Sequence, residues 1–202
     1  MRRHGSNITG DSGTSGWMPW NSTSYPRERR ESEFPMADVM EESNERLVIR
    51  KLIPASREDV FAAWSDPAGM RYWMCPGDVI LAEAQLDFRV GGRFRILMKG
   101  EREDHDHTGV YQEIEPPSKL SFTWVSKNTD FKTTLVTIQL FERDGGTELV
   151  LTHERFPSAD RVRRHLGGWA QIADRLVEHL RKSRKVTNAQ REVSHHERTI
   201  GK

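Results

Sequence analysis

The chain has 202 residues, of which 35% are hydrophobic and 30% are charged, and its formal net charge is +1. A charge so close to zero excludes an overall field that attracts nucleic acid, and no apolar run approaches the roughly 18 residues of a membrane helix, so we expect neither nucleic-acid binding nor membrane insertion. Cys75 is the only cysteine, which excludes an intrachain disulfide and favours a reducing compartment such as the cytoplasm.

Three segments of the chain differ in composition. Residues 1–44 are rich in Gly, Ser, Thr, Asn and Pro, which predicts a disordered leader. Translation starting at Met36 or Met40 would remove most of this leader. Residues 45–182 carry the pattern of a folded domain. Residues 183–202 form a basic polar tail, for which a frayed, solvated helix end is the simplest interpretation, although a basic tail can also contact anionic surfaces.

The folded pattern opens with one strand and two short helices. The stretch "RLVIRKLI", Arg46 to Ile53, has strand composition and is closed by Pro54. Ser56, followed three residues later by Asp59, predicts a capped helix start. Asp66 before Pro67 predicts a second helix, with Asp as the N-cap and Pro at the first position, that ends by Pro76.

Between Val79 and His153 the hydrophobic period changes to two, which is typical of strands. Turn signals at Gly91-Gly92, Pro116-Pro117, Asn128–Asp130 and Asp144–Gly146 separate the runs. Connections this short require antiparallel pairing of consecutive strands. We therefore predict about six strands after the first. The alternating positions are Phe88 and Val90; Phe94, Ile96 and Met98; Thr108, Val110 and Gln112; Leu120, Phe122 and Trp124; Val136, Ile138 and Leu140; and Leu149, Leu151 and His153.

The stretch "DFRVGGRFRILMKG" raises the question of a phosphate-binding loop. Such a loop leads from a strand into a helix N-terminus, whose free N–H groups face the anion. Gly91-Gly92 instead leads into another alternating run, and no GKS or GKT follows. The pair is therefore predicted to form a hairpin turn, and Arg89, Arg93 and Arg95 are expected on a solvated face.

After Pro157 the period returns to 3.6, which predicts a long helix with Ser158 as its cap. Gly167-Gly168 breaks helix rules in the middle of this segment and costs about 1 kcal/mol per residue relative to Ala. Two accounts stay open: the pair thins the helix where it crosses the sheet or a cavity mouth, or it marks a kink or a later helix start. The apolar stripe consists of Val162, Leu166, Trp169, Ile172, Ala173, Leu176 and Leu180.

Four motifs in this order carry a resemblance to a known family: "VFAAWSDPAGMRYW", "DFRVGGRFRILM", "GVYQEIEPPSKLSFTW" and "HLGGWAQIADRLVEHL". They resemble the Activator of Hsp90 ATPase homologue 1-like domain of the START-like superfamily. The resemblance implies an α+β helix-grip fold of the Bet v 1-like type, with about seven antiparallel strands curved around a long C-terminal helix. It also implies a cavity between that helix and the sheet.

On this basis we expect a binding protein for a small apolar or aromatic ligand, with no cofactor, no metal and no catalytic residue. A homodimer stays open. One alternative is a cyclase or hydrolase that uses His153 or His165 as general base. A second is stimulation of an Hsp90 ATPase, disfavoured because the N-terminal stretch contains no NxNNWHW motif. The expected cavity residues are Trp73, Phe88, Phe94, Ile96, Met98, Tyr111, Phe122, Trp124, Leu151, His153, Trp169 and Ile172.

The histidines and the single cysteine are each candidates for metal binding or catalysis. His105 and His107, two apart on a strand, could share a metal, but no third ligand falls at a suitable spacing, so exposed loop histidines are the simpler interpretation. His153 ends an inward face and is either a core histidine or a group that orients a ligand or acts as a base. His165 is expected at the cavity rim, and Cys75 is expected to be an idle thiol.

Overall fold

The computed structural model of the protein describes residues 39–43 and 45–200, with side chains along the last helix as far as residue 185. The elements in chain order are β1 (Val39–Glu42), β2 (Arg46–Ile53), α1 (Arg57–Ala63), α2 (Pro67–Trp73), β3 (Val79–Leu86), β4 (Arg93–Gly100), β5 (His105–Glu115), β6 (Lys119–Ser126), the 3-10 turn η1 (Lys127–Thr129), β7 (Thr134–Arg143), β8 (Gly146–Glu154) and α3 (Ala159–Ile200).

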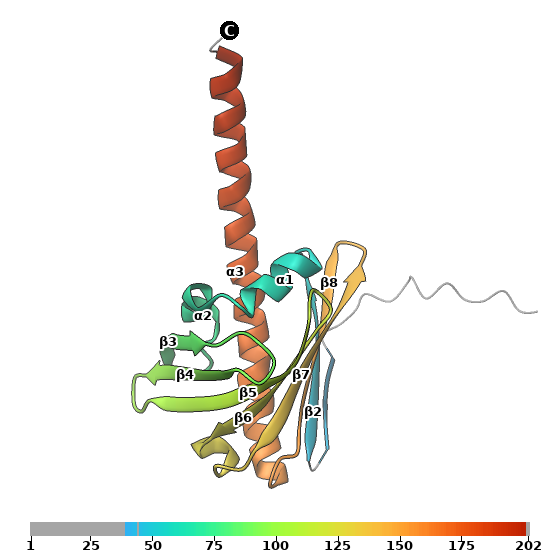
Figure 1. The fold of residues 1–202 in the computed structure, drawn as a ribbon, viewed down its shortest axis with the longest axis vertical. Coiled ribbons are helices and arrows are strands. Elements are labelled where there is room, and N and C mark those ends of the chain that lie inside the picture. Colours follow the sequence, from blue (N-terminus) through green and yellow to red (C-terminus); the bar gives the residue numbers. More distant parts are fainter. Residues whose placement is uncertain (1–38, 44, 201–202) are drawn as a thin grey trace, which may run out of the picture. The chain divides into compact units, whose positions relative to one another are not determined.

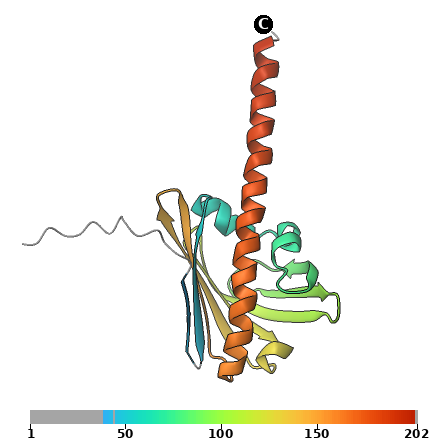
Figure 2. The ribbon, with the colours of Figure 1, turned by 180° about the vertical axis from the view of Figure 1, so that it is seen from behind.

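Eight strands form one antiparallel sheet in the order β1-β2-β8-β7-β6-β5-β4-β3. The sheet curves, and α3 lies across its concave side (Figure 1). Seen from behind, α3 lies in front of the sheet with strands on either side of it, and its C-terminal part extends beyond the sheet (Figure 2). This arrangement confirms the predicted helix-grip fold, in which one long helix is held by a bent sheet.

The structure adds one strand to the predicted seven. β1 pairs antiparallel with β2, from Val39 opposite Arg50 to Glu42 opposite Leu47. This strand falls inside the segment 1–44 that the sequence indicates as a leader. It was not predicted because its four residues, two apolar and two acidic, are too few to give a periodic signal. Residues 1–38 of that leader lie outside the described residues.

Both short helices begin where the sequence predicts. Ser56 Oγ accepts a hydrogen bond from the backbone N–H of Asp59 at 3.1 Å. Asp66 Oδ1 accepts from the N–H of Ala68 at 3.0 Å, and Pro67 stands at the first helical position. These side chains satisfy N–H groups that have no partner within the helix, which fixes the start of α1 and α2.

Gly91-Gly92 forms a turn between strands, as predicted, and no helix follows it. Gly91 has a φ of +76°, a conformation that glycine adopts without strain. Its N–H donates to the carbonyl of Tyr111 at 2.8 Å, and the N–H of Tyr111 donates to the carbonyl of Gly92 at 3.0 Å. The preceding strand ends at Leu86, earlier than predicted, so Phe88 lies in the connection to β4.

The core lies between α3 and the concave face of the sheet. The predicted stripe on α3 is confirmed: Val162, Trp169, Ile172, Ala173 and Leu176 are buried, and Leu166 and Leu180 pack against the same core. An ion pair between Lys51 Nζ and Asp174 Oδ1, 2.6 Å apart, ties the helix to β2. None of the described helices is long and apolar enough to cross a membrane.

Candidate functional site

A pocket of about 450 Å³ opens beside α3, where the helix passes β4, β5 and the connection from α2 to β3. Volumes of this size are ordinary for small-molecule sites, which occupy roughly 300–1,000 Å³. Most of its surface is apolar, and polar side chains and bare backbone make up the rest. The lining residues are Pro76, Gly77, Asp78, Val79, Met98, Glu103, His105, His107, Trp124, Asn128, Arg164, His165, Gly167, Gly168, Trp169, Gln171 and Ile172.

Two rings in contact form the inner wall of this pocket. The rings of His107 on β5 and Trp124 on β6 have centroids 4.5 Å apart and are tilted by 34°. Nδ1 of His107 and Nε1 of Trp124 are both buried without a hydrogen-bond partner among the described residues. A buried polar atom without a partner costs free energy, and both atoms belong to the packed part of the wall because neither has accessible surface.

His107 is buried and not, as the sequence indicated, an exposed loop histidine. β5 begins at His105, so His107 falls on the inward face of the strand with Gly109 and Tyr111. Burial, followed by the charges of His165 and His105, lowers the pKa of His107 to about 4. The imidazole is therefore neutral at pH 7 and offers one N–H and one lone pair.

His165 stands on the helix side of the pocket, at the rim where the sequence placed it. Its Nδ1 donates to the backbone carbonyl of Arg161, one turn earlier, at 2.8 Å. Because a carbonyl only accepts, this bond places the proton of the neutral ring on Nδ1 and leaves Nε2 with a lone pair. Burial is the largest cause that lowers the pKa of His165 below its ordinary value.

His153 is a core histidine and does not line the pocket. Trp169 Nε1–H donates to His153 Nδ1 at 2.9 Å, and His153 Nε2 lies 2.7 Å from the hydroxyl of Thr134. The Thr134 hydroxyl donates to the carbonyl of Trp124 at 2.7 Å. The Trp169 indole, the neutral His153 ring and the Thr134 hydroxyl each have one proton to donate. The hydrogen bonds therefore run in a single direction, from Trp169 through His153 and Thr134 to the carbonyl of Trp124.

The centre of the interior beneath α3 is closely packed, so the open space between this helix and the sheet lies in the pocket described above. The space left at the centre of the interior is only about 10 Å³, which is at most the size of one water molecule. Aromatic rings interlock there: Phe94 and Phe122 meet edge to face at 5.4 Å, and Trp64 and Trp73 do so at 5.0 Å. The residues around this small void are Trp64, Met70, Met74, Phe94, Ile96, Tyr111, Leu120, Phe122 and Trp124.

The predicted cavity residues divide into three groups. Met98, Trp124, Trp169 and Ile172 line the open pocket. Phe94, Ile96, Tyr111 and Phe122 surround the small void. Trp73, Leu151 and His153 are fully buried core residues that line neither space, and Phe88 packs edge-on against Tyr111 at 5.0 Å. All are packed between the helix and the sheet, but only the first group can reach a guest molecule.

Sequence reasoning missed most of the polar pocket wall. His107 and Asn128 were not assigned to it, nor were Asp78, Glu103 and Gln171. Gln171 accepts a hydrogen bond from the N–H of Gly77 at 2.7 Å and so joins α3 to the connection after α2. One signal was available: His107 lies two residues from Gly109 and four from Tyr111, on one face of a strand.

Metal and thiol chemistry find no support among the described residues. No group of three or more His, Cys, Asp or Glu side chains in that part of the chain could hold a metal ion. Cys75 is buried, and its thiol donates to the carbonyl of Arg71 at 3.3 Å. Burial raises the pKa of this thiol, which disfavours the reactive thiolate.

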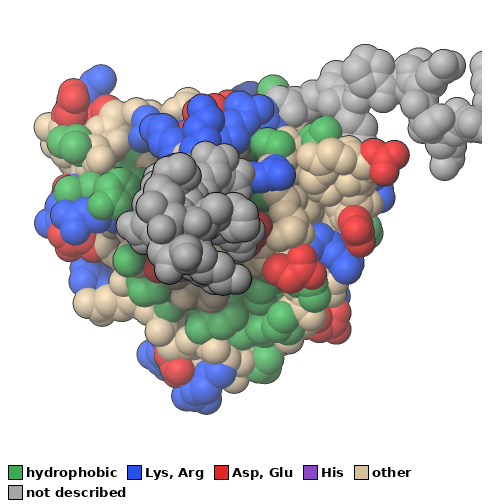
Figure 3. All heavy atoms as spheres, turned by 90° about the horizontal axis from the view of Figure 1, so that it is seen from above, with side chains coloured by type: hydrophobic (Ala, Val, Ile, Leu, Met, Phe, Trp, Pro, Cys, Tyr) green, Lys and Arg blue, Asp and Glu red, His purple; other side chains and the backbone are tan. Residues whose placement is uncertain are grey.

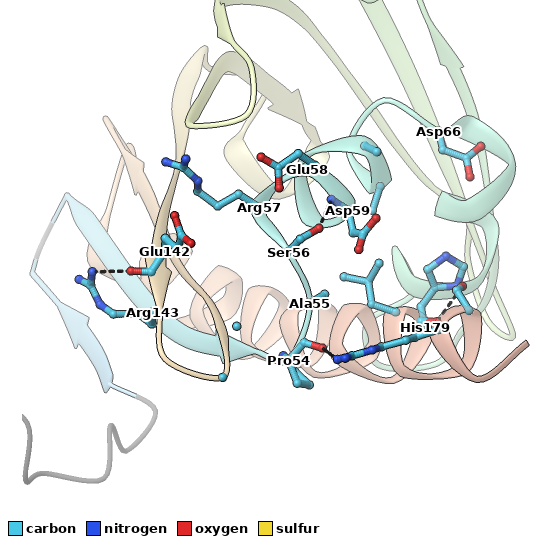
Figure 4. Close-up of a pocket in the computed structure, with 17 residues that line it drawn as sticks. Pro54, Ala55, Ser56, Arg57, Glu58, Asp59, Asp66, Glu142, Arg143 and His179 are labelled. Atoms are coloured by element: carbon cyan, nitrogen blue, oxygen red, sulfur yellow. Dashed lines mark hydrogen bonds between the residues drawn. The ribbon is translucent and has the colours of Figure 1, made fainter. Parts of the chain in front are cut away.

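A second, larger groove lies between α1, the β7–β8 turn and α3 (Figure 4). Its polar groups already hold the fold together: Ser56 caps α1, Arg143 pairs with Glu148, and Arg184 donates to the carbonyl of Pro54 at 3.4 Å. On this end of the domain, charged side chains of both signs are interspersed with hydrophobic ones (Figure 3). We therefore place the candidate site in the pocket beside His107 and Trp124.

The curved sheet, the long helix and the pocket at their junction define a helix-grip domain of the START-like class. The chain belongs to the family described as Activator of Hsp90 ATPase homolog 1-like protein, which residues 54–181 match. No curated protein matches the sequence.

Solved structures from several bacteria share this fold. An Activator of Hsp90 ATPase homolog 1-like protein from Aeromonas hydrophila has 26% identity and a TM-score of 0.56, over 68% of this chain and 93% of its own. A protein from Rhodobacter sphaeroides has 24% identity and a TM-score of 0.60, over 71% and 95%. A protein from Chromobacterium violaceum has 23% identity and a TM-score of 0.58, over 66% and 95%.

Proposed function

We propose that the protein binds a small, partly apolar molecule in the pocket between α3, β4 and β5. The observation that carries this proposal is the pocket itself, which offers about 450 Å³ of open space beside α3. Met98, Trp124 and Ile172 offer apolar contact there, and His165 and Gln171 offer polar groups.

Two other indole nitrogens, in Trp64 and Trp73, also lack a partner, but neither residue lines the pocket. Trp64 borders the small central void, and Trp73 packs edge-on against Trp64. Trp124 borders both the central void and the open pocket, whereas Trp73 borders neither. This difference makes Trp73 a matched control for Trp124.

A thermal-shift screen tests the proposal, because a ligand that binds only the native state raises its apparent stability. Lipids, polyketides, aromatic acids and phenols form the panel. We expect at least one class to raise the Tm of the wild type and of Trp73→Phe, and to raise that of Trp124→Phe much less. A panel without effect on the wild type, or an effect equal in Trp73→Phe and Trp124→Phe, would argue against this site.

Catalysis in the same pocket is the second candidate, and one contact favours His165 over His153 for it. The free lone pair of His165 Nε2 stands on a residue that lines the pocket, whereas both nitrogens of His153 are occupied in the core. If a polyketide or ester substrate is turned over, His165→Gln should abolish turnover while binding persists. Unchanged turnover in His165→Gln would remove this candidate.

A further inference from the structure

Helix α3 continues through the basic segment at the end of the chain. Among the residues whose side chains are described, Leu180 is the last one of α3 that packs against the core, and the backbone stays helical as far as Ile200. Residues 181–200, which we call the arm, are about 30 Å long at a rise of 1.5 Å per residue. The arm extends away from the sheet (Figure 1, Figure 2).

The overall net charge of +1 conceals an uneven distribution along the chain. Residues 181–202 contain seven Lys/Arg and two Glu, a net charge of +5, whereas residues 1–180 contain 24 Lys/Arg and 28 Asp/Glu, a net charge of −4. The expectation that the protein binds no nucleic acid came from the value for the whole chain. Clustering of Lys and Arg along one helix is the electrostatic footprint of a nucleic-acid-binding element.

The cations at the base of the arm are exposed to solvent. Arg181 forms an ion pair with Glu178 at 3.0 Å. Lys182 and Lys185 have no ionic partner among the described residues, so their charges are available to a polyanion. The exposed cations in this part of the arm are Arg181, Lys182, Arg184 and Lys185.

Three arginines of the arm share one face of the helix. Arg184, Arg191 and Arg198 follow one another at intervals of seven residues, and residues seven apart return to the same face after two turns. Glu192 and Glu197 occupy other positions around the helix. Each interval is about 10 Å along the axis, and duplex DNA carries one charge per roughly 1.7 Å of its own axis. The row of arginines therefore matches a row of phosphates.

A groove with acidic residues at the base of the arm limits where a polyanion can bind. Arg184 donates to the carbonyl of Pro54, which lines this groove, at 3.4 Å. Carboxylates there would repel phosphate, so we place the contact on the outer part of the arm, around Arg191 and Arg198. The carboxylates that line the groove are Glu58, Asp59, Asp66 and Glu142.

The composition of the arm favours a nucleic acid over a lipid surface. Helices that lie in a membrane surface bury Trp, Phe or Leu in the lipid, and residues 181–200 contain none of these. The remaining polar residues of the arm are Ser, Thr, Asn, Gln and His. Phosphate oxygens in nucleic acids accept hydrogen bonds from Arg and Lys and also from Ser, Thr, Asn and Gln.

We propose that the arm binds double-stranded DNA through its phosphates, independently of base sequence, and that Arg191 and Arg198 supply the main contacts. A helix is roughly 10–12 Å across with its side chains, which fits the major groove of B-form DNA at roughly 12 Å. The major groove of double-stranded RNA is too narrow for this. The inference uses no residue of the pocket beside His107 and Trp124, so it is independent of the proposed ligand binding.

Fluorescence anisotropy of the full-length protein with a labelled duplex of about 20 base pairs tests the proposal. We expect the wild type to bind at about 50 mM salt and to weaken steeply toward 200 mM. Arg191→Gln/Arg198→Gln should weaken binding at least tenfold at the lower salt concentration. It should also reduce the slope of log K against log salt by about 2, because each phosphate contact adds about 0.9.

Two further variants separate the arm from total charge and from helix stability. Arg71→Gln/Arg163→Gln removes the same charge from exposed positions outside the arm and should leave binding within twofold. Arg191→Lys/Arg198→Lys should keep a slope close to that of the wild type, because lysine contacts a phosphate as a point charge.

Three results would overturn the proposal. The first is no binding of the duplex by the wild type at about 50 mM salt. The second is equal weakening in the arm variant and in Arg71→Gln/Arg163→Gln. The third is sedimentation with vesicles of phosphatidylcholine and phosphatidylserine that depends on Arg191 and Arg198 while the duplex stays unbound, which would make the arm a membrane-surface element.

Discussion

Trp169 donates its indole N–H to Nδ1 of His153 across 2.9 Å, and this single contact decides what His153 can do. The lone pair that a general base would need is already engaged. The opposite nitrogen, Nε2, is held 2.7 Å from Thr134, and the side chain is fully buried. Burial also holds the pKa of His153 well below its ordinary value. His153 therefore links α3 to the sheet and is not available for chemistry.

The Thr134 link in this chain predicts a stability effect. Thr134→Val keeps the shape of the side chain but leaves His153 Nε2–H without a partner and removes one hydrogen bond to the carbonyl of Trp124. We expect a loss of about 1–3 kcal/mol in the free energy of unfolding, measured in urea. Thr137→Val, on the half-buried outward face of the same strand, is the control and should change stability by less than about 0.5 kcal/mol. Equal losses of stability in both variants would contradict this chain of hydrogen bonds.

His107 predicts a pH effect with a definite sign. Its pKa is about 4 in the folded protein against 6.5 for the unperturbed group. The unfolded state therefore binds more protons between these values, so stability falls as pH drops below 6.5. The contribution of His107 between pH 7 and pH 5 corresponds to a loss of about 2 kcal/mol.

His107→Gln isolates this contribution, because glutamine stays neutral throughout the range. The variant should lose about 2 kcal/mol less than the wild type when urea unfolding at pH 7 is compared with pH 5. His153 and His165, whose pKa values burial also lowers, act in both proteins and leave a residual slope. Parallel pH profiles for the two proteins would mean that His107 is not buried in the neutral form.

Gly109 predicts a packing effect in the core of the sheet. Its missing Cβ leaves room for the ring of Phe94 and the backbone of Thr123. Gly109→Ala forces one of them to move, and such overpacking typically costs about 1–3 kcal/mol. Chemical denaturation would measure this loss, and a Gly109→Ala protein as stable as the wild type would show that the strand relaxes freely there.

The elements with strong periodicity could be predicted from the sequence. The stripe from Val162 to Leu180 places its large apolar residues against the sheet with the spacing of one helix face. Ser56 and Asp66 cap their helices because their side chains act on N–H groups two or three residues away. Local chemistry of this kind needs no knowledge of the rest of the fold.

The pocket could be predicted only in part, because it depends on contacts between distant segments. The inward residues of β5 are His107, Gly109 and Tyr111, a series without apolar alternation, so the pattern did not reveal which face was buried. Trp124 was expected inside, but its indole nitrogen has no hydrogen-bond partner because of which groups the neighbouring strands place beside it, and the sequence does not show this. The glycine pair was visible in the sequence as an anomaly, but the open space around Gly167 could be seen only in the structure.

The most direct test follows the indole N–H of Trp124 by ¹⁵N–¹H NMR during titration with the compound that raises the Tm most in the thermal-shift panel, with the resonance assigned from its loss in Trp124→Phe. The account predicts that this resonance moves on binding because Trp124 lines the pocket, while the indole resonance of Trp73, which lines neither the pocket nor the central void, stays nearly in place. An unmoved Trp124 resonance at saturation, or a larger movement of Trp73, would contradict it.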